Sequence, residues 1–337
     1  MPDKKINLLI NLPDGFYKTP QLADKFKHLE EIAEVRKRSH NTPEEIQGDL
    51  SWAEAVIMWS WPVFNEGILA KAPGLKFIGH INGTQTSAKA SFARGIAVSE
   101  ARHCWSPAVA EMALALMLTA LRKVGDYHAD MRAGKEKWVN VFPTDIDPLE
   151  RQLTGRSVGI VGFGGIGQRL AELLAPFRIE LRVYDPFLPG SVTAKYNAKP
   201  VTLMELIQGS EIVVLCAANN KGSEKLVGPK EIEAFQKNSV LVNVGRSSLI
   251  DMAALEERLS RQDMVAMLDV FDKEPLERDS SLRKLPNAYL TPHRAGGLME
   301  SVERALSMLI GDLEAFLEGR ERKYALTEAA LPSLPER

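Results

Sequence analysis

Short apolar runs alternate with helical repeats over the first hundred residues of the chain. The apolar runs that fit strands are Ile6–Ile10, Ala55–Trp59 and Leu75–Gly79. Apolar positions recur at helical spacing in Gln21–Leu29, Val63–Lys71 and Ala88–Arg94. Since strands that alternate with helices pair in parallel, this region predicts a parallel sheet with helices on both faces.

A long helical run follows the first block. It begins at Ser106, an N-cap residue type followed by Pro107, and it closes at Gly134. Its Ala and Leu residues lie on several faces, so we expect it to be buried between layers or domains. The polar, proline-bearing segment Trp138–Leu153 is predicted to be a connection.

A second alternating block occupies residues 157–292. Its predicted strands are residues 157–161, 180–184, 211–216, 239–243, 265–269 and 288–291. Beyond it, Leu298–Leu317 has helical spacing, and the proline-rich segment Leu331–Arg337 is expected to be mobile. The pattern therefore predicts an α/β protein with two Rossmann-like, doubly wound parallel sheets.

Composition and charge narrow the class of protein. With 337 residues, the chain is long for one core and two domains are expected. A net charge of -2 gives no electrostatic case for binding nucleic acid or an anionic membrane. The two cysteines, Cys104 and Cys216, are too few for a disulfide framework, and no metal site is predicted. Neither a secretory signal nor a membrane-spanning segment is evident, so we expect a cytoplasmic location.

The stretch GFGGIG has the spacing of a dinucleotide-binding loop. It places Gly162, Gly164 and Gly167 between the apolar run SVGIV and an amphipathic helix, whose N-terminus would face the pyrophosphate. Asp185 ends the next apolar run, where a carboxylate accepts hydrogen bonds from the adenosine ribose. A purely structural turn is the alternative interpretation. Since Asp185 would repel a 2′-phosphate, NAD is preferred over NADP.

Three charged or titratable residues follow late strands of the second block. Arg246 ends the run SVLVNVGR, Glu274 follows AMLDVFDK, and His293 follows NAYLTP. Because ligands bind outside the carboxyl ends of parallel strands, all three are expected at one edge. Such a set suits hydride transfer between an alcohol and a carbonyl. Taken singly, each also fits a solvated surface group, a packed or capping histidine, or a turn residue.

The ordered motifs of the chain resemble the D-isomer-specific 2-hydroxyacid dehydrogenase family from about Val56 to about Leu317. The matching motifs are GFGGIG with Asp185, Asn243-x-x-Arg246, Asp269-Val-Phe-x-x-Glu274-Pro275, Thr291-Pro292-His293 and Val109-Ala110-Glu111. Their order and spacing agree over much of the chain, which makes the resemblance specific.

The resemblance implies a role for each catalytic position. Arg246 would bind the substrate carboxylate and the reacting oxygen. His293 would exchange a proton with the substrate hydroxyl or carbonyl, and Glu274 would orient His293 and favour its protonated form. Asp269 would lie beside the nicotinamide. The positions implied to bind the cofactor are Gly162, Gly164, Gly165, Ile166, Gly167, Asp185, Cys216, Ala218, Val244, Gly245, Asp269 and Val109.

The resemblance also implies how the chain is divided. Residues 1–102 and 299–337 would form a substrate-binding domain, and residues 103–298 an NAD-binding domain, with the active site in a cleft between them. Members of the family are usually homodimers that associate through the cofactor domain, and Met112–Leu121 is a reasonable contributor.

Two departures from the family pattern concern the substrate. Where relatives commonly show Gly-x-Gly and an aspartate, this chain has Asn82-Gly83-Thr84, whose N–H groups either hold a carboxylate or form only a strand–helix turn. Trp59 stands where several relatives place an arginine. With Trp61 and Trp105 it would form an aromatic wall at the substrate, or else belong to the ordinary core.

The favoured hypothesis is an NAD-dependent oxidoreductase that acts on a D-2-hydroxy acid or a 2-oxo acid, with His293 as the acid–base. Two alternatives stay open. One is an NAD(H)-sensing, corepressor-like binding protein of the same fold. The other is a dehydrogenase of a phosphorylated hydroxyacid such as 3-phosphoglycerate, which Trp59 disfavours.

Overall fold

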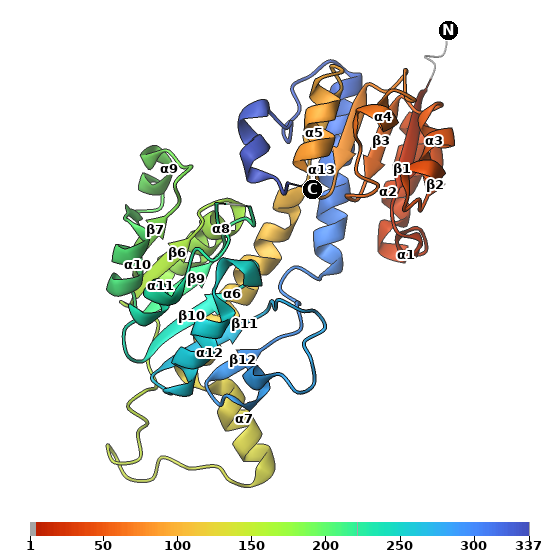
Figure 1. Cartoon of the computed structure of the whole chain (residues 1–337). Helices are drawn as coiled ribbons and strands as arrows, with labels where there is room; N and C mark the ends of the chain where they lie inside the picture. The colour runs from red at the N-terminus through yellow and green to blue at the C-terminus, as the bar shows by residue number, and fades with distance from the viewer. Residues whose placement is uncertain (1–4, 221, 337) are drawn as a thin grey trace. The chain divides into compact units, whose positions relative to one another are not determined.

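The computed structural model describes residues 5–220 and 222–336 (Figure 1). The chain divides into two compact units, one formed by Met1–Trp105 with Leu298–Arg337 and the other by Ser106–Gly297. The boundaries between the units therefore fall after Trp105 and after Gly297, whereas the sequence predicted them after residues 102 and 298.

The first unit contains a five-stranded parallel sheet in the order β2-β1-β3-β4-β5. Its strands are β1 (Ile6–Asn11), β2 (Ala33–Arg38), β3 (Ala55–Met58), β4 (Phe77–His80) and β5 (Ala97–Glu100). The apolar runs predicted β1, β3 and β4. They missed β2, AEVRKR, whose charged residues suit an edge strand, and they missed the short β5, AVSE.

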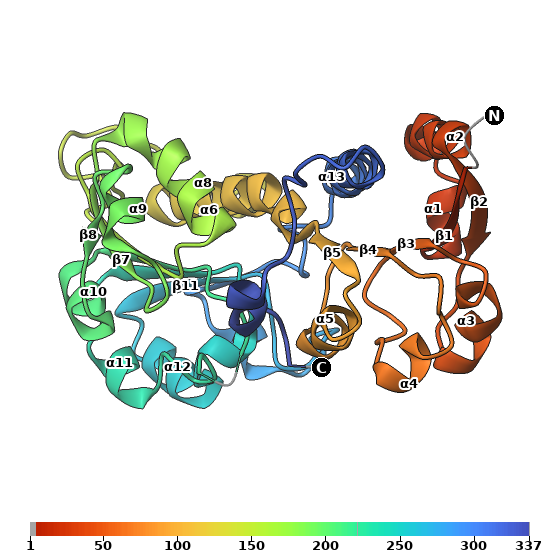
Figure 2. The same ribbon diagram turned by 90° about the horizontal axis from the view of Figure 1, so that it is seen from above.

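Helices cover both faces of this sheet. They are α1 (Asp14–Tyr17), α2 (Ala23–Ile32), α3 (Pro43–Leu50), α4 (Glu66–Leu69), α5 (Gln85–Phe92) and α13 (Met299–Leu317). Figure 2 shows α2 and α13 on one face and α3, α4 and α5 on the other. Alternate residues of β1 serve the two cores: Leu8 and Ile10 pack with Leu309 of α13, whereas Leu9 packs with Ile46 of α3.

The C-terminal segment is docked on α5. Leu334 is buried against Ala88 and Val98, and the main-chain N–H of Gln85 donates to Pro335 O at 3.0 Å. The expected mobility of this segment is therefore wrong for the described residues 331–336, because an apolar side chain and a hydrogen bond hold it. Arg337 lies outside the described residues.

The second unit contains a seven-stranded parallel sheet in the order β12-β11-β10-β9-β6-β7-β8. Its strands are β6 (Ser157–Val161), β7 (Glu180–Tyr184), β8 (Lys199–Pro200), β9 (Ile212–Leu215), β10 (Ser239–Asn243), β11 (Met264–Leu268) and β12 (Ala288–Leu290). All six predicted strands are present, and only the two-residue β8 was missed. The predicted fold class, two doubly wound parallel α/β sheets, is confirmed.

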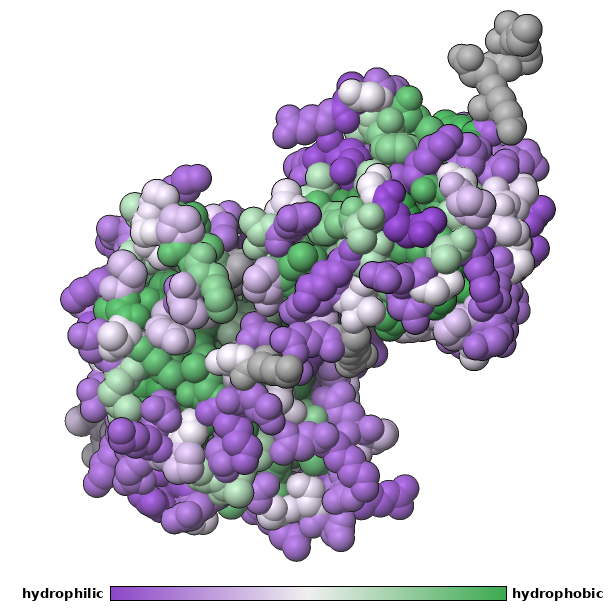
Figure 3. Space-filling model, turned by 45° about the horizontal axis from the view of Figure 1, so that its top comes forward, coloured by the Kyte–Doolittle hydropathy of each residue, from purple (hydrophilic) through white to green (hydrophobic). Residues whose placement is uncertain are grey.

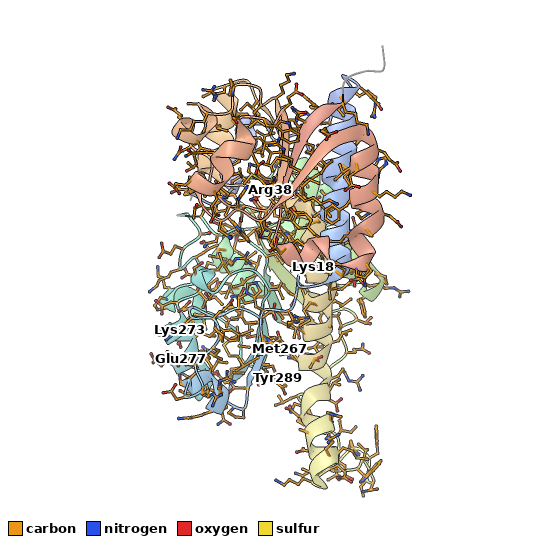
Figure 4. The ribbon with its side chains drawn as sticks, turned by 90° about the vertical axis from the view of Figure 1, so that its right-hand side faces the viewer. Lys18, Arg38, Met267, Lys273, Glu277 and Tyr289 are labelled. Atoms are coloured by element: carbon orange, nitrogen blue, oxygen red, sulfur yellow. The ribbon has the colours of Figure 1, made fainter. Side chains whose placement is uncertain are left out.

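The helices of this unit also lie on both faces of its sheet. They are α6 (Ser106–Arg122), α7 (Val124–Ala133), α8 (Gly165–Leu174), α9 (Gly190–Ala194), α10 (Leu203–Gly209), α11 (Pro229–Glu233) and α12 (Met252–Ser260). In Figure 2, α6 and α8 lie on one face, and α10, α11 and α12 on the other. On the sheet itself, Met267 of β11 pairs with Tyr289 of β12, and the Tyr289 hydroxyl donates to Asp126 of α7 (Figure 4).

The single helix predicted from Ser106 to Gly134 is broken at Lys123. This residue has a φ of 48°, in the left-handed region, and its Nζ donates to Asp147 Oδ2 at 2.5 Å. Beyond the break, α7 (VGDYHADMRA) has no buried residue, so the burial expected for the whole run is correct only for α6.

Among the described residues, one helical stretch, Arg102–Arg122, is long and apolar enough to cross a membrane. The stretch meets this criterion by length and composition only. More than half of the stretch is buried inside the protein, as expected of a core helix. On the face shown in Figure 3, hydrophilic side chains cover most of the visible surface of each unit.

Candidate active site

The glycine-rich loop lies at the point where the strand order of the second sheet reverses. From β6 the chain proceeds outward to β7 and β8, whereas β9 returns to the other side of β6. The loops after β6 and β9 therefore meet at the edge where open sheets bind ligands. Gly162 has a φ of 86°, and a Cβ there would lie 2.4 Å from the Cα of Ala217. Only glycine fits this position.

The other glycines of the motif bring a helix close to the sheet and leave its N-terminus open. A Cβ at Gly167 would lie 2.5 Å from Gly162 O, so a side chain would push α8 away from the loop. A Cβ at Gly164 would meet no atom within 4 Å. The free N–H groups at the start of α8 thus border an open backbone, which suits a pyrophosphate. These residues fit the predicted NAD.

Asp185 is fixed at the end of β7 by two main-chain donors. Its carboxylate accepts hydrogen bonds from Phe163 N at 2.7 Å and from Phe187 N at 2.9 Å. A pocket beside it is lined by residues that include Tyr184, Asp185, Pro186, Leu188, Thr202 and Glu205. The carboxylate therefore lies beside the glycine loop, where it has further lone pairs for ribose hydroxyls.

The other predicted cofactor residues lie in loops at the same edge or on α6. Cys216 and Ala218 follow β9, Val244 and Gly245 follow β10, and Val109 is buried on α6. Burial raises the pKa of the Cys216 thiol to about 12, so the thiol stays neutral. Contact between these residues and NAD stays a prediction.

His293 and Glu274 form a direct pair. His293 Nδ1 lies 2.7 Å from Glu274 Oε2, and Glu274 Oε1 accepts a hydrogen bond from Phe271 N at 3.0 Å. Burial opposes ionisation of Glu274, but the hydrogen bonds from His293 and Phe271 lower its pKa below the ordinary value. The pair stands on loops after β12 and β11, where Lys273 and Glu277 flank Glu274 with an ion pair (Figure 4).

Arg246 belongs to the same group of charges. It lies exposed in the loop after β10, and its positive charge contributes to lowering the pKa of Glu274. Asn243 shapes this loop, since its Nδ2 donates to Arg246 O at 3.0 Å and its Oδ1 accepts from Gly245 N at 3.1 Å. The structure therefore brings Arg246, Glu274 and His293 to one edge of the second sheet, as the sequence predicted.

Asp269 anchors the loop that carries His293. The carboxylate is fully buried, and it accepts hydrogen bonds from Thr291 Oγ1 at 2.5 Å, Arg294 N at 2.9 Å and Ala295 N at 2.8 Å. In addition, His293 N donates to Asp269 O at 2.9 Å. Sequence reasoning placed Asp269 beside the nicotinamide and missed this anchoring role. The contact with nicotinamide stays a prediction.

The predicted substrate loop of the first unit is held by a carboxylate of the protein itself. Gly83 N donates to Glu100 Oε2 at 2.7 Å, and a Cβ at Gly83 would lie 2.4 Å from that oxygen. Thr84 Oγ1 accepts from Ser87 N and so caps α5. The N–H of Gly83 is therefore occupied, which corrects the expectation that it holds a substrate carboxylate. Sequence reasoning missed Glu100; substrate contact by Asn82 and Thr84 stays a prediction.

Two buried groups at this point have pKa values shifted by burial. Glu100 and His80 are register partners on β5 and β4. Burial raises the pKa of Glu100 to about 7 and lowers the pKa of His80 to about 4. Both shifts favour the uncharged form, as expected where water is excluded.

The three tryptophans form one cluster, as predicted. The Trp59 ring centroid lies 5.9 Å from that of Trp61 and 5.9 Å from that of Trp105. Trp59 belongs to the first unit and Arg246 to the second, so their contact with one substrate stays a prediction.

A model of the family described as D-isomer specific 2-hydroxyacid dehydrogenase, NAD binding domain, matches residues 114–295. The chain is 28% identical over 321 residues to D-3-phosphoglycerate dehydrogenase of Methanocaldococcus jannaschii, covering 94% of this chain and 59% of that protein. It thus spans less than two thirds of that relative. It is 29% identical over 271 residues to glyoxylate reductase of Thermococcus litoralis, covering 80% of this chain and 82% of that protein.

A phosphoglycerate oxidoreductase from Rhizobium etli has a similar solved structure. The TM-score is 0.81 at 24% identity, and the likeness covers 95% of this chain and 97% of that one. At 24% identity, this likeness shows that the two proteins share a fold and nothing more.

Replacing Glu100 by Gln should remove a pH-dependent loss of stability. Because the folded pKa of Glu100 is raised to about 7 from 4.5, its contribution is complete below pH 4.5 and is lost as pH rises through 7. Between about pH 5 and about pH 8, the wild type should lose roughly 1–3 kcal/mol of unfolding free energy relative to Glu100→Gln. Urea denaturation measures the difference.

The Gln side chain retains an oxygen that can accept from Gly83 N. His80 makes the unfolding free energy vary with pH in the opposite direction. Because His80 is present in both the wild type and Glu100→Gln, its contribution cancels in the difference between them. A difference that does not vary with pH would show that Glu100 titrates normally.

Replacing Asp185 by Ala should weaken the preference for NADH. The substitution removes the charge that opposes a 2′-phosphate and the acceptor for ribose, so the NADH-to-NADPH ratio of affinities should fall about tenfold. Fluorescence titration with both cofactors measures the ratio. The control is Glu172→Ala. This substitution removes an exposed carboxylate on α8 and should leave the NADH-to-NADPH ratio unchanged. An unchanged ratio in Asp185→Ala would contradict the assignment.

Proposed function

The chain belongs to the D-isomer-specific 2-hydroxyacid dehydrogenase family, and we propose that it is an NAD-dependent oxidoreductase that interconverts a D-2-hydroxy acid and its 2-oxo acid. The observation that carries the proposal is the 2.7 Å contact between His293 and Glu274, at the edge that also holds Arg246. The same edge carries the glycine-rich loop. An acid–base, a cation and a dinucleotide site are thus built on one sheet.

Arg246 supplies a fixed positive charge for the substrate. Its guanidinium carries five donors in a planar fork, which matches a carboxylate and also reaches the oxygen on C2. In the 2-oxo acid this polarises the carbonyl, and in the hydroxy acid it stabilises the oxygen as its proton leaves.

His293 moves the proton at that oxygen. Because Nδ1 faces Glu274, Nε2 is the ring nitrogen left for the substrate. Glu274 fixes the direction of the ring and stabilises the imidazolium, so His293 donates a proton to the 2-oxo acid or accepts one from the hydroxy acid. When bound, NAD would supply the acceptor or the donor of the hydride that C2 loses or gains.

The complete set of Arg246, Glu274 and His293 favours an enzyme over an NAD(H)-sensing binding protein, which needs no acid–base. The proposal assigns substrate binding to the first unit and cofactor binding to the second. It includes a small 2-hydroxy or 2-oxo acid as substrate, a preference for NAD, and a cytoplasmic location.

A homodimer is also part of the proposal, and exposed apolar side chains after α7 support it. Trp138, Val139, Val141 and Phe142 are 64%, 59%, 58% and 78% exposed. Such a group of large apolar side chains is unusual on a surface that stays in water. In Met112–Leu121, by contrast, Leu116, Met117 and Leu121 are buried, so we assign the contact to residues 138–142 instead.

Replacing His293 by Ala should abolish most turnover and leave NADH binding nearly intact. Removing a general acid–base costs roughly 100- to 10,000-fold in kcat. NADH oxidation with glyoxylate, hydroxypyruvate and pyruvate measures turnover, and NADH fluorescence measures binding.

The matched control is His28→Ala, since His28 Nε2 lies 2.6 Å from Glu314 Oε1 in a second His–Glu pair, on α2 and α13. This variant should keep wild-type kcat. Wild-type turnover in His293→Ala would remove His293 from the mechanism, and no turnover of a broad 2-oxo acid panel by the NADH-bound wild type would overturn the proposed function.

Replacing Trp138 and Phe142 together by Ser should dissociate the dimer. The loss of two large apolar side chains removes several kcal/mol of burial across a symmetric contact. Sedimentation should give twice the chain mass for the wild type and the single-chain mass for the double variant. Phe187→Ser, another exposed aromatic position at 73%, should remain dimeric. A monomeric wild type would contradict the assignment.

A further inference from the structure

The segment between β4 and α5 contains the only Asn-Gly pair of the chain, at Asn82 and Gly83. In such a pair the main-chain nitrogen of the glycine can attack the side-chain carbonyl carbon of the asparagine, because glycine has no Cβ to shield that nitrogen. The product is a cyclic imide, and the asparagine loses its amide nitrogen as ammonia. A fold that only fixes the backbone slows this reaction, so the groups that contact the reacting atoms decide its rate.

The attacking nitrogen shares its hydrogen with a carboxylate. Gly83 N donates to Glu100 Oε2 at 2.7 Å, within the range over which a general base takes a proton. Glu100 is buried at the end of β5, beside its register partner His80 on β4. Its other oxygen, Oε1, is buried and has no hydrogen-bond partner among the described residues. A carboxylate that is solvated this poorly is a stronger base than one in water.

The carbonyl under attack is polarised by an N–H group. Trp105 Nε1 donates to Asn82 Oδ1 at 3.0 Å. The same N–H stabilises the negative charge that forms on Oδ1 during the attack, as the donors of an oxyanion hole do. Asn82 is only partly buried, so water reaches the product. The nucleophile, the base and the oxyanion donor all belong to the first unit.

We propose that Asn82 is a site of self-catalysed deamidation, with Glu100 as the base and Trp105 as the oxyanion donor. Glu100 Oε2 takes the proton of Gly83 N as the N–Cγ bond forms and the carbonyl electrons move to Asn82 Oδ1. The Cγ–Nδ2 bond then breaks, and Nδ2 leaves as ammonia with the proton that Glu100 took. Water opens the imide and leaves an aspartyl or isoaspartyl residue at position 82. Neither NAD nor a 2-oxo acid takes part, so the reaction is independent of the proposed function.

The conversion changes the loop that leads into α5. It adds a negative charge next to the Gly83–Glu100 hydrogen bond, and the isoaspartyl form also lengthens the main chain. Thr84, the N-cap of α5, follows directly in the sequence. The converted protein should therefore unfold at a lower urea concentration than the fresh protein, so the reaction alters this loop as the protein ages.

Mass spectrometry of the folded protein, incubated at about pH 8 and digested in acid, tests the inference. Peptides that contain position 82 should first lose the mass of ammonia and then gain that of water. The reference is the same chain unfolded in guanidinium chloride, which keeps the Asn-Gly pair but loses the contacts of Glu100 and Trp105. The folded wild type should convert at least about tenfold faster than the unfolded chain. A folded rate equal to or below the unfolded rate would overturn the inference.

Conservative variants separate the chemical roles from structural support. In Glu100→Gln the side chain still accepts from Gly83 N but takes no proton, so conversion should slow at least about tenfold. Trp105→Phe keeps a ring and removes the N–H donor, which should also slow conversion about tenfold. The matched control is Trp52→Phe, a partly buried tryptophan before β3, which should keep the wild-type rate. Circular dichroism establishes folding, and a wild-type rate in either folded variant would contradict the role assigned to that residue.

The pH dependence of the rate gives an independent result. The groups beside Glu100 are His80, Arg102 and Cys104. Burial moves the pKa of His80 to about 4 and that of Cys104 to about 12, so both stay neutral near pH 7, and Arg102 stays charged.

Burial raises the pKa of Glu100 to about 7, and only its ionised form accepts a proton. The folded wild-type rate should therefore rise with pH up to about 7 and level off above it. In the unfolded chain and in folded Glu100→Gln, hydroxide is the base, and the rate should keep rising about tenfold per pH unit. A wild-type rate that rises at this slope throughout would overturn the inference.

Discussion

The buried carboxylate of Asp269 determines the geometry on which the proposed chemistry depends. A buried charge is tolerated only where its oxygens receive enough hydrogen bonds, and here Thr291, Arg294 and Ala295 provide them. These donors come from both sides of His293, so the loop cannot move without exposing an unsatisfied charge. This also explains why His293 holds a φ of 50°, which an isolated chain would rarely adopt.

Ionisable groups in the two units are arranged in opposite ways. In the second unit, Arg246, Glu274 and His293 are exposed, and the hydrogen bond from His293 and the positive charge of Arg246 help to lower the pKa of Glu274. In the first unit, Glu100 and His80 are buried beside the predicted substrate loop, and burial favours their neutral forms. Glu100 therefore supports the loop as a hydrogen-bond acceptor for Gly83, whereas the surroundings of Glu274 favour its ionised form.

Features with a local physical cause could be predicted from the sequence. Strands such as β10, SVLVN, are buried throughout and read as continuous apolar runs, and the positions of Arg246, Glu274 and His293 follow from the carboxyl ends of those strands. Features that depend on distant contacts could not be predicted. Pairing with β1 makes the charged segment AEVRKR a strand, and the acceptor for Gly83 N lies on β5. Docking of Leu334 depends on Val98 and Ala88, far away in the sequence.

The same topological rule operates in both sheets, and the residues after the strands give it different chemistry. Where the order reverses in the second sheet, Gly162 and Gly164 leave backbone N–H groups open, which favours a charged, strongly hydrated ligand such as pyrophosphate. At the reversal in the first sheet, Phe16 and Trp59 present ring surface instead. An anion gains little from such rings, because their faces are electron-rich. The two sheets therefore share one topological rule, and the residues that follow their strands decide which chemical surface each reversal presents.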